Sequence, residues 1–165
     1  TEDGVAIHNV YLPAGGDEPD RETNPKFAHK LDFVSELGAW GAERSGPAIL
    51  VGDLNIAPRE DDVWSHRQLL KVVSHTPVET ESFVAAREAG RWTDVTRTHI
   101  PEGKLYSWWS YRARDWAASD RGRRLDHVWA SPELAPTARA SRVLREARGW
   151  DKPSDHVPVL AEFEI

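Results

Sequence analysis

The sequence predicts a single α+β domain built around β-sheet, and three observations support this fold class. Short apolar runs rich in β-branched residues outnumber the segments that have helical periodicity. The predicted strands flank the helices irregularly, which argues against a strictly alternating doubly wound fold. The length of 165 residues fits one domain with a buried core, and no repeat or low-complexity tract divides it.

The first part of the chain contains two predicted strands separated by a helix. Residues 5–11 form a β-branched and aromatic run that ends at Pro13 and leads into a long loop rich in Gly and Asp. Apolar residues recur every three to four positions in residues 26–43, directly after Pro25, and predict an amphipathic helix. The continuous apolar run of residues 48–51 is typical of a strand covered on both faces.

The remaining elements are two predicted helices and four strands. Residues 61–73 carry apolar side chains at helical spacing and predict a short helix. Residues 76–79, Thr-Pro-Val-Glu, combine a capping box with Pro at the first helical position, and they begin a helix that runs to Gly90. The alternation of side chains in the last segment marks a final strand. The four predicted strands are residues 106–109, 124–130, 138–143 and 157–165.

Composition excludes several classes of protein. The chain contains no Cys, which excludes disulfide scaffolds, thiolate zinc sites and cysteine nucleophiles. No apolar run approaches the roughly 18 residues that a membrane span needs, and the first residues lack the features of a signal peptide. A cytoplasmic protein without a membrane partner or an evident obligate protein partner is the simplest interpretation. Because the chain contains no Met, even at position 1, we expect that processing or truncation removed the true start.

Charge and aromatic residues are distributed unevenly along the chain. The net charge of -6 argues against a uniformly basic surface for polyanions. Residues 106–125, however, contain five Arg and two Asp, a formal charge of +3, together with three of the eight Trp. Aromatic faces interleaved with guanidinium groups suit nucleotides, because stacking and phosphate contacts combine there. Trp is also the largest core residue, so Trp109 or Trp116 is assigned to the core as readily as to a substrate.

Two junctions between a loop and a strand carry groups that suit phosphate chemistry. Asp53 and Asn55 follow the buried apolar run, and in an extended backbone their side chains point to the same side. Such an oxygen pair binds a hard cation or holds an attacking water, although an Asp and an Asn that only satisfy a turn are the alternative. Asp155 and His156 precede the last strand, where a carboxylate can hold a divalent ion and an imidazole can donate to a phosphate oxygen.

Asp126 interrupts an otherwise apolar strand pattern, where an ionised carboxylate is costly unless it is paired. His156 is one candidate partner, and the pairing would also fix the tautomer of its imidazole. An ion pair of Asp126 with Arg121, Arg123 or Arg124 agrees equally well with the charges. Both alternatives stay open on the sequence alone.

Five segments contain most of these candidate groups. They are Asn9–Pro13, Gly52–Pro58, Tyr106–Arg112, Arg121–His127 and Lys152–Val159. In this order they resemble the motifs of the exodeoxyribonuclease III family, within the endonuclease/exonuclease/phosphatase superfamily. The Asp-x-Asn and Ser-Asp-His-x-Pro motifs are shared across that superfamily, whereas the aromatic and Arg segment before Asp126 is the narrower signal for its DNA repair branch.

The resemblance implies a fold and an activity. The implied fold is a four-layered α/β/β/α sandwich of the deoxyribonuclease I-like type, of which residues 1–165 would be the C-terminal portion of a single domain. The early strands with a metal-binding Glu have no counterpart here. The implied activity is a magnesium-dependent DNA phosphodiesterase of base-excision repair, a 3′ to 5′ exonuclease on duplex DNA and an abasic-site endonuclease. The alternatives are a phosphatase of the same superfamily that acts on a phosphoinositide or nucleotide, and a catalytically inactive fragment.

The resemblance also implies catalytic roles for matching positions. Asp53 would be the general base that deprotonates the attacking water, and Asn55 would help to hold that water or the developing oxyanion. His156 would contact a nonbridging phosphate oxygen, and Asp126 would orient His156. Tyr11 would lie beside the phosphate or the leaving oxygen.

Metal and DNA contacts follow from the same matches. Asp53, Asn55 and Asp155 would form the metal site. Mg²⁺ is preferred over zinc because the site is rich in oxygen and lacks thiolates, and Mn²⁺ would substitute. The partner would be double-stranded DNA with abasic sites or 3′ ends. The residues expected to contact DNA are Lys26, Trp108, Arg112 and His156.

Overall fold

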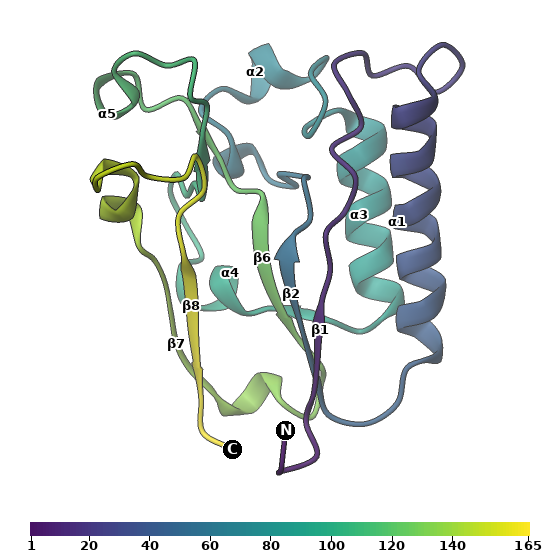
Figure 1. Ribbon diagram of the computed structural model, residues 1–165. Coiled ribbons are helices and arrows are strands. Elements are labelled where there is room, and N and C mark those ends of the chain that lie inside the picture. Colours follow the sequence, from purple (N-terminus) through teal and green to yellow (C-terminus); the bar gives the residue numbers. More distant parts are fainter.

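The computed structural model describes all 165 residues and arranges them in layers (Figure 1). The helices α1 (Pro25–Glu43) and α3 (Pro77–Ala89) pack together on one face of the main sheet. The two-stranded sheet of β7 (Ala138–Val143) and β8 (Val159–Phe163) lies against the opposite face. The predicted mixed α and β class is therefore confirmed.

The main sheet has four strands in the order β1-β2-β6-β3. β1 (Ala6–Asn9) runs parallel to β2 (Ala48–Asp53), and β6 (Asp126–Ala130) is antiparallel to both β2 and β3 (Thr93–Asp94). Because β2 and β6 are antiparallel, the end of β2 lies beside the beginning of β6. The loops that follow β1 and β2 leave the sheet at this same end.

Short elements connect these layers. They are η1 (Glu60–Asp62), α2 (His66–Leu69), α4 (Val95–His99), β4 (Trp108–Trp109), α5 (Trp116–Ser119), β5 (Gly122–Arg123), η2 (Ala135–Thr137) and η3 (Arg145–Gly149). β4 and β5 form a separate antiparallel pair. No helix combines the length and the apolar character that crossing a membrane requires.

The two long helices begin where the sequence predicts. The side chain of Asn24 accepts a hydrogen bond from the backbone of Lys26 at the start of α1, and Pro25 occupies the first turn. At the start of α3, Thr76 and Glu79 form the predicted capping box. These caps satisfy backbone N–H groups that have no partner within the helix.

The predicted helix over residues 61–73 is wrong. The structure contains only the short turns η1 and α2 in this region. Val63 instead forms an isolated antiparallel bridge with Arg123, and the backbone N–H of Trp64 donates to the carbonyl of Gly122. Pairing with the strand-like segment around Gly122 therefore replaces the helical hydrogen bonds, although the side-chain spacing suits a helix. The predicted strand over residues 106–109 is likewise shorter, limited to β4.

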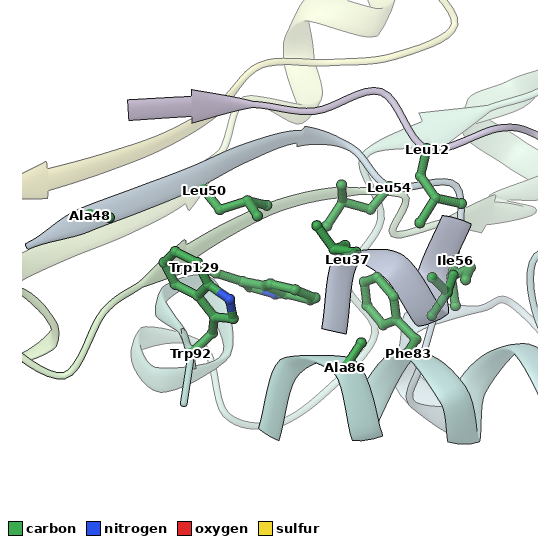
Figure 2. Packing of buried hydrophobic residues seen from close by; sticks show 11 residues of the cluster. Leu12, Leu37, Ala48, Leu50, Leu54, Ile56, Phe83, Ala86, Trp92 and Trp129 are labelled. Carbon is green, nitrogen blue, oxygen red and sulfur yellow. The ribbon is translucent and has the colours of Figure 1, made fainter. Parts of the chain in front are cut away.

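Two apolar cores cover the two faces of β2. Figure 2 shows the first core, in which side chains of α1 and α3 meet those of β2, β6 and the loops after β1 and β2. Its buried members are Leu12, Val34, Leu37, Ala48, Leu50, Leu54, Ile56, Phe83, Ala86, Trp92 and Trp129. Ile49 and Val128 face the second core, against Val159 and Phe163 of β8. The expectation that the strand at 48–51 is covered on both faces is confirmed.

A buried ion network ties the short elements to the main sheet. The guanidinium of Arg124 is fully buried and donates to Asp62 at 2.8 and 3.0 Å and to Asp94 at 2.8 and 3.2 Å. Arg97 of α4 also binds Asp62. Buried charges are tolerated when their hydrogen bonds are satisfied in this way. Burial alone would raise the pKa values of Asp62 and Asp94, but Arg124 holds both below their usual range.

β1 forms one edge of the main sheet, because β2 is its one hydrogen-bonded neighbour. An apolar groove of about 470 Å³ lies between β1 and α1. In this groove Ile7 is 59% exposed and Trp40 is 38% exposed. A strand edge beside exposed apolar side chains favours pairing with another strand or self-association.

We expect Arg124→Met to lower the free energy of unfolding by about 4 kcal/mol, because it leaves two buried carboxylates short of their cation. The melting temperature, measured by circular dichroism, should fall by roughly 10 °C. Arg142→Met is the matched control, since Arg142 is exposed, and it should change stability by less than about 0.5 kcal/mol. Equal stabilities of the two variants would contradict this account of the network.

Candidate active site

The turn that follows β2 places Asp53 and Asn55. Gly52 has a φ of 141°, and a Cβ there would lie 1.9 Å from the carbonyl oxygen of Val10, so this position requires Gly. Asn55 has a φ of 50°, in the left-handed region that Asn tolerates better than most residues. Its side-chain amide donates to Asp53 Oδ2 at 3.1 Å and to the carbonyl of Leu12 at 2.9 Å.

These hydrogen bonds show that Asp53 and Asn55 do satisfy a turn, as the simpler alternative proposed. The backbone N–H of Asn55 also donates to Asp53 Oδ1 at 3.0 Å. The Oδ1 atom of Asn55 nevertheless has no hydrogen-bond partner in the protein, and Asn55 lines a cleft. The turn therefore holds both side chains and leaves Asn55 Oδ1 without a protein partner, as an acceptor for a ligand or water.

Asp126 lies directly opposite Asp53, because the two residues pair across β2 and β6. Like charges in directly opposite positions of a sheet destabilise it unless a cation lies between them. The hydroxyl of Ser107 fixes the start of β6, since it accepts the backbone N–H groups of Leu125 and Asp126, both at 3.0 Å. Two carboxylates are thus held at one end of the sheet, where β2 ends and β6 begins.

His156 lies between these two carboxylates. Its Nδ1 atom is 2.8 Å from Asp126 Oδ2, and its Nε2 atom is 3.8 Å from Asp53 Oδ2. Candidate ligand atoms of the three residues all lie within 4.8 Å of one another. The partner of Asp126 is therefore His156, whereas Arg124 pairs with Asp62 and Asp94.

The segment around β4 holds His156 in place through a short antiparallel bridge. The backbone N–H of Val157 donates to the carbonyl of Ser107 at 2.8 Å, and that of Trp109 donates to the carbonyl of Asp155 at 2.9 Å. The indole N–H of Trp108 donates to Asp155 Oδ2 at 3.0 Å. The Trp-rich segment therefore orients both Asp155 and His156.

Burial and neighbouring charges shift the pKa values of this site. Burial raises the pKa of Asp53, although the nearby His156 opposes the shift. Burial alone would lower the pKa of His156. The hydrogen bond to Asp126 and the charges of Asp126, Asp53 and Asp155 outweigh it, so the pKa of His156 rises above its usual range. The protonated imidazole is the favoured form beside these carboxylates.

A cleft of about 610 Å³ adjoins the site and is lined by Asn55 and His156 at the catalytic end. Its other walls carry cations that pack on aromatic rings. The guanidinium of Arg121 lies 4.7 Å from the ring centre of Trp64, and that of Arg123 lies 5.3 Å from the ring centre of Trp108. The side chains of the basic and aromatic wall are Trp64, Trp108, Arg112, Arg121 and Arg123.

The structure brings together most of the residues that the sequence singled out. Asp53, Asn55, Asp126 and His156 form one cluster, and Asp155 and Trp108 adjoin it. Arg112 is exposed on the wall of the cleft. Trp109, by contrast, is 1% exposed and belongs to the core.

Tyr11 and Lys26 lie at the border of the site and make no side-chain hydrogen bond. Tyr11 is 67% exposed and precedes Leu12, whose carbonyl binds Asn55. Lys26 is exposed at the start of α1, and its stem lies near Gly16, which lines the cleft.

Trp64 and Ser107 were not identified as site residues from the sequence. The helix predicted over residues 61–73 does not form around Trp64, so the position of Trp64 in the cleft wall does not follow from the sequence pattern. Ser107 acts through backbone contacts of its hydroxyl, which no sequence spacing reveals. Arg123 is predicted both as one of the five Arg of residues 106–125 and as a candidate partner of Asp126, but no sequence spacing indicates its cation–π contact with Trp108.

Known proteins share this architecture. The Endonuclease/Exonuclease/phosphatase family matches residues 6–156. Exodeoxyribonuclease III of Haemophilus influenzae is 28% identical over 169 residues, which cover 97% of this chain and 62% of that protein. An AP endonuclease from Archaeoglobus fulgidus superposes with a TM-score of 0.90 at 27% identity, covering 98% of this chain and 62% of that one.

A 3′ phosphatase from Neisseria bound to product DNA hairpin is also similar, with a TM-score of 0.88 and 33% identity, over 98% of this chain and 62% of that chain. The chain thus spans 62% of the length of each of these three proteins. The family match extends over most of the chain and includes the motifs that build the cluster of Asp53, Asp126 and His156. The chain therefore belongs to the endonuclease/exonuclease/phosphatase family.

Proposed function

We propose that this chain carries the catalytic machinery of a DNA repair nuclease, a hydrolase that cuts phosphodiester bonds at abasic sites and at 3′ ends of duplex DNA. The observation that carries the proposal is the cluster of Asp53, His156 and Asp126 at one end of a cleft walled by Arg and Trp. The names of the relatives, an exodeoxyribonuclease III and an AP endonuclease, support it. A cytoplasmic location stays a prediction.

Asp53 is the proposed general base. A carboxylate whose pKa is raised by burial is a stronger base than an exposed one, which suits proton removal from water. Asn55 holds Asp53 through its amide N–H, and its free Oδ1 atom can accept a hydrogen bond from the same water. The water would then attack phosphorus in line with the leaving oxygen, and its proton would pass to Asp53. The bond from phosphorus to the leaving oxygen breaks as the new bond forms, and the leaving oxygen takes up a proton from solvent.

His156 is the proposed donor to the phosphate. Its Nδ1–H donates to Asp126, and because the pKa of His156 is raised the imidazolium is favoured, so that Nε2 also carries a proton that can be donated to a nonbridging oxygen. As negative charge develops on that oxygen, a fixed imidazolium stabilises it more in the transition state than in the ground state. Asp126 acts through His156 and is a positioning residue.

Mg²⁺ is the proposed cofactor, with Mn²⁺ as a substitute. The proposed donors fit a hard cation, because Asp53 and Asp155 offer carboxylate oxygens, Asn55 offers an amide oxygen and the chain has no Cys. Asp53, Asn55 and Asp155 would hold the ion, with Asp155 offering the oxygen that Trp108 does not engage. When bound, the ion supplies Lewis acid stabilisation of the phosphate charge.

The proposed DNA contacts combine stacking and charge. Trp108 and Arg112 line the cleft beside His156 and would contact the nucleotide at the cut site. Lys26 would contact the DNA backbone at the rim, and Tyr11 would lie beside the phosphate. The acidic total charge does not oppose this arrangement, because the substrate meets the local field of the cleft.

A phosphatase of the same superfamily is the second candidate, and the relative named as a 3′ phosphatase favours it in one form. The cations Arg112, Arg121 and Arg123 along the cleft would suit the extra charge of a phosphomonoester. A phosphoinositide or a nucleotide would be an alternative substrate. The Trp residues interleaved with Arg favour DNA over either of them. Release of inorganic phosphate without strand cleavage would identify this activity.

We also propose that residues 1–165 are the C-terminal portion of a longer catalytic domain. This proposal rests on the motifs that match and on the share of the relatives that the chain spans. The exposed groove beside β1 is a suitable place for further strands of such a domain.

We expect Asp53→Asn in the full-length protein to reduce cleavage of a duplex oligonucleotide with one abasic-site analogue by roughly 10³-fold, because the base is lost. The assay compares magnesium with a chelator, and the wild type should be active only with the metal. Asp32→Asn is the matched control, since Asp32 is exposed on α1 and pairs only with Arg21. Undiminished cleavage by Asp53→Asn would refute the assignment of the base.

We expect the imidazole of His156 in the metal-free protein to titrate above pH 6.5, the ordinary pKa of His, and to titrate at lower pH in Asp126→Asn. Removing the negative partner destabilises the imidazolium, so the pKa must fall. The measurement is the chemical shift of the imidazole C–H group against pH by NMR, assigned with His156→Asn. An unchanged pKa in Asp126→Asn would show that Asp126 does not hold the proton on His156.

We expect residues 1–165 alone to bind magnesium poorly, to cleave DNA weakly if at all, and to self-associate through the β1 edge. The comparison is cleavage by this chain beside the full-length protein, together with light scattering of both. Cleavage by residues 1–165 at the rate of the full-length protein, from a monodisperse monomer, would contradict the proposal that a further part of the domain is required.

A further inference from the structure

Lys30 of α1 and Glu79 of α3 form an ion pair inside the protein. Both side chains are 0% exposed, and Lys30 Nζ lies 2.6 Å from Glu79 Oε1. Replacing a buried ion pair by apolar residues of similar size is often neutral or stabilising. A contribution to net stability therefore does not by itself explain this pair. Its remaining hydrogen bonds connect it to the candidate active site.

The ammonium group of Lys30 uses its other donors on two active-site loops. Nζ donates to the carbonyl of Asn55 at 2.8 Å and to the carbonyl of Ala14 at 3.2 Å. With Glu79, these acceptors account for all three ammonium protons. The loops after β1 and β2 are thus held by one cation from α1.

The loop after β1 also packs closely on the stem of Lys30. Gly15 has a φ of 90°, and a Cβ at Gly15 would lie 2.8 Å from Lys30 Cδ. The backbone of this loop therefore approaches the buried side chain as closely as Gly permits.

Glu79 fixes the other side of the pair. Its carboxylate accepts the backbone N–H groups of Ser74 at 2.9 and 3.0 Å and of Thr76 at 3.1 Å, and the hydroxyl of Thr76 at 2.7 Å. These bonds cap α3 and hold Glu79 in one place. The fixed carboxylate of Glu79 therefore holds the ammonium group of Lys30 in the position from which it donates to Asn55.

Asn55 needs such an anchor because of its backbone conformation. Its positive φ carries an energetic cost even for Asn, so contacts with the surroundings help to hold it. Lys30 holds the carbonyl, Asp53 holds the N–H, and Leu12 holds the side-chain amide. Of these three, Lys30 provides the one charged donor.

We propose that Lys30, anchored by Glu79, is a positioning residue for the active site: it imposes the turn at Asn55 that places the carboxylate of Asp53 beside His156 and the side chain of Asn55 on the cleft. The inference rests on the proposed function as far as catalysis is concerned. The positioning itself is a property of the protein without substrate.

The test uses three variants of the full-length protein. Lys30→Met leaves Glu79 without its cation, so the melting temperature should fall by roughly 10 °C. The double variant Lys30→Met, Glu79→Gln removes both charges and keeps an acceptor for the cap of α3, so it should melt close to the wild type. Val95→Ala is the control, because Val95 is buried in the second core and its loss destabilises the fold away from the site.

The first readout is amide hydrogen exchange without DNA or metal. In the double variant the N–H of Asn55 should exchange at least 10-fold faster, while that of Leu50 in the middle of β2 should not change. The second readout is cleavage of the abasic-site oligonucleotide. In the double variant kcat should fall roughly 10- to 100-fold with KM changed less than about threefold, because a displaced base affects chemistry more than binding. Val95→Ala should keep its kcat.

Unchanged exchange at Asn55 in the double variant would overturn the inference whatever the activity. Faster exchange with an unchanged kcat would overturn it as well, because the turn would then not affect the reaction. A wild-type protein that cuts no DNA would refute the proposed function instead, and the exchange experiment would still decide whether Lys30 imposes the turn.

Discussion

The architecture of the site depends on one electrostatic constraint, the pairing of Asp53 and Asp126 across adjacent strands. Two carboxylates in directly opposite positions repel each other and favour separation of the strands. The imidazole of His156 lies between them and has its pKa raised by the same charges. The end of the sheet is therefore most stable when a proton or another cation resides there.

Buried charged side chains near this end of the sheet hold the segments that carry the site. Arg124 joins η1, β3 and the start of β6 through Asp62 and Asp94. Lys30 of α1 likewise joins the loops after β1 and β2. Each cation binds more than one segment at once. Hydrogen bonds restrict the relative orientation of these segments more than apolar contacts do. The hydrogen bonds of these buried ions thus add directional contacts to loops whose apolar side chains already pack in the first core.

The sequence predicts the regular elements well, because their signals are local. Pro25, the capping box at Thr76 and the apolar run at 48–51 each indicate a boundary to within a few residues. The candidate residues at the ends of strands also come together as expected. The helix predicted over 61–73 fails because its backbone pairs with a segment about 60 positions later, around Gly122, and periodicity does not report such partners. For the same reason the sequence leaves the partner of Asp126 open.

The net charge of the chain does not describe the electrostatic field at the cleft, because some charged groups are buried and others line the cleft. Several acidic and basic groups cancel in the interior, such as Asp62 and Asp94 against Arg124, and these contribute little to the field outside. The cleft retains Arg112, Arg121 and Arg123 on its wall, with Trp rings beneath two of the guanidinium groups. A polyanion approaching this face meets cations held at fixed positions on rigid rings, so less side-chain entropy is lost on binding than with free lysines. An acidic protein can therefore present a site for nucleic acid.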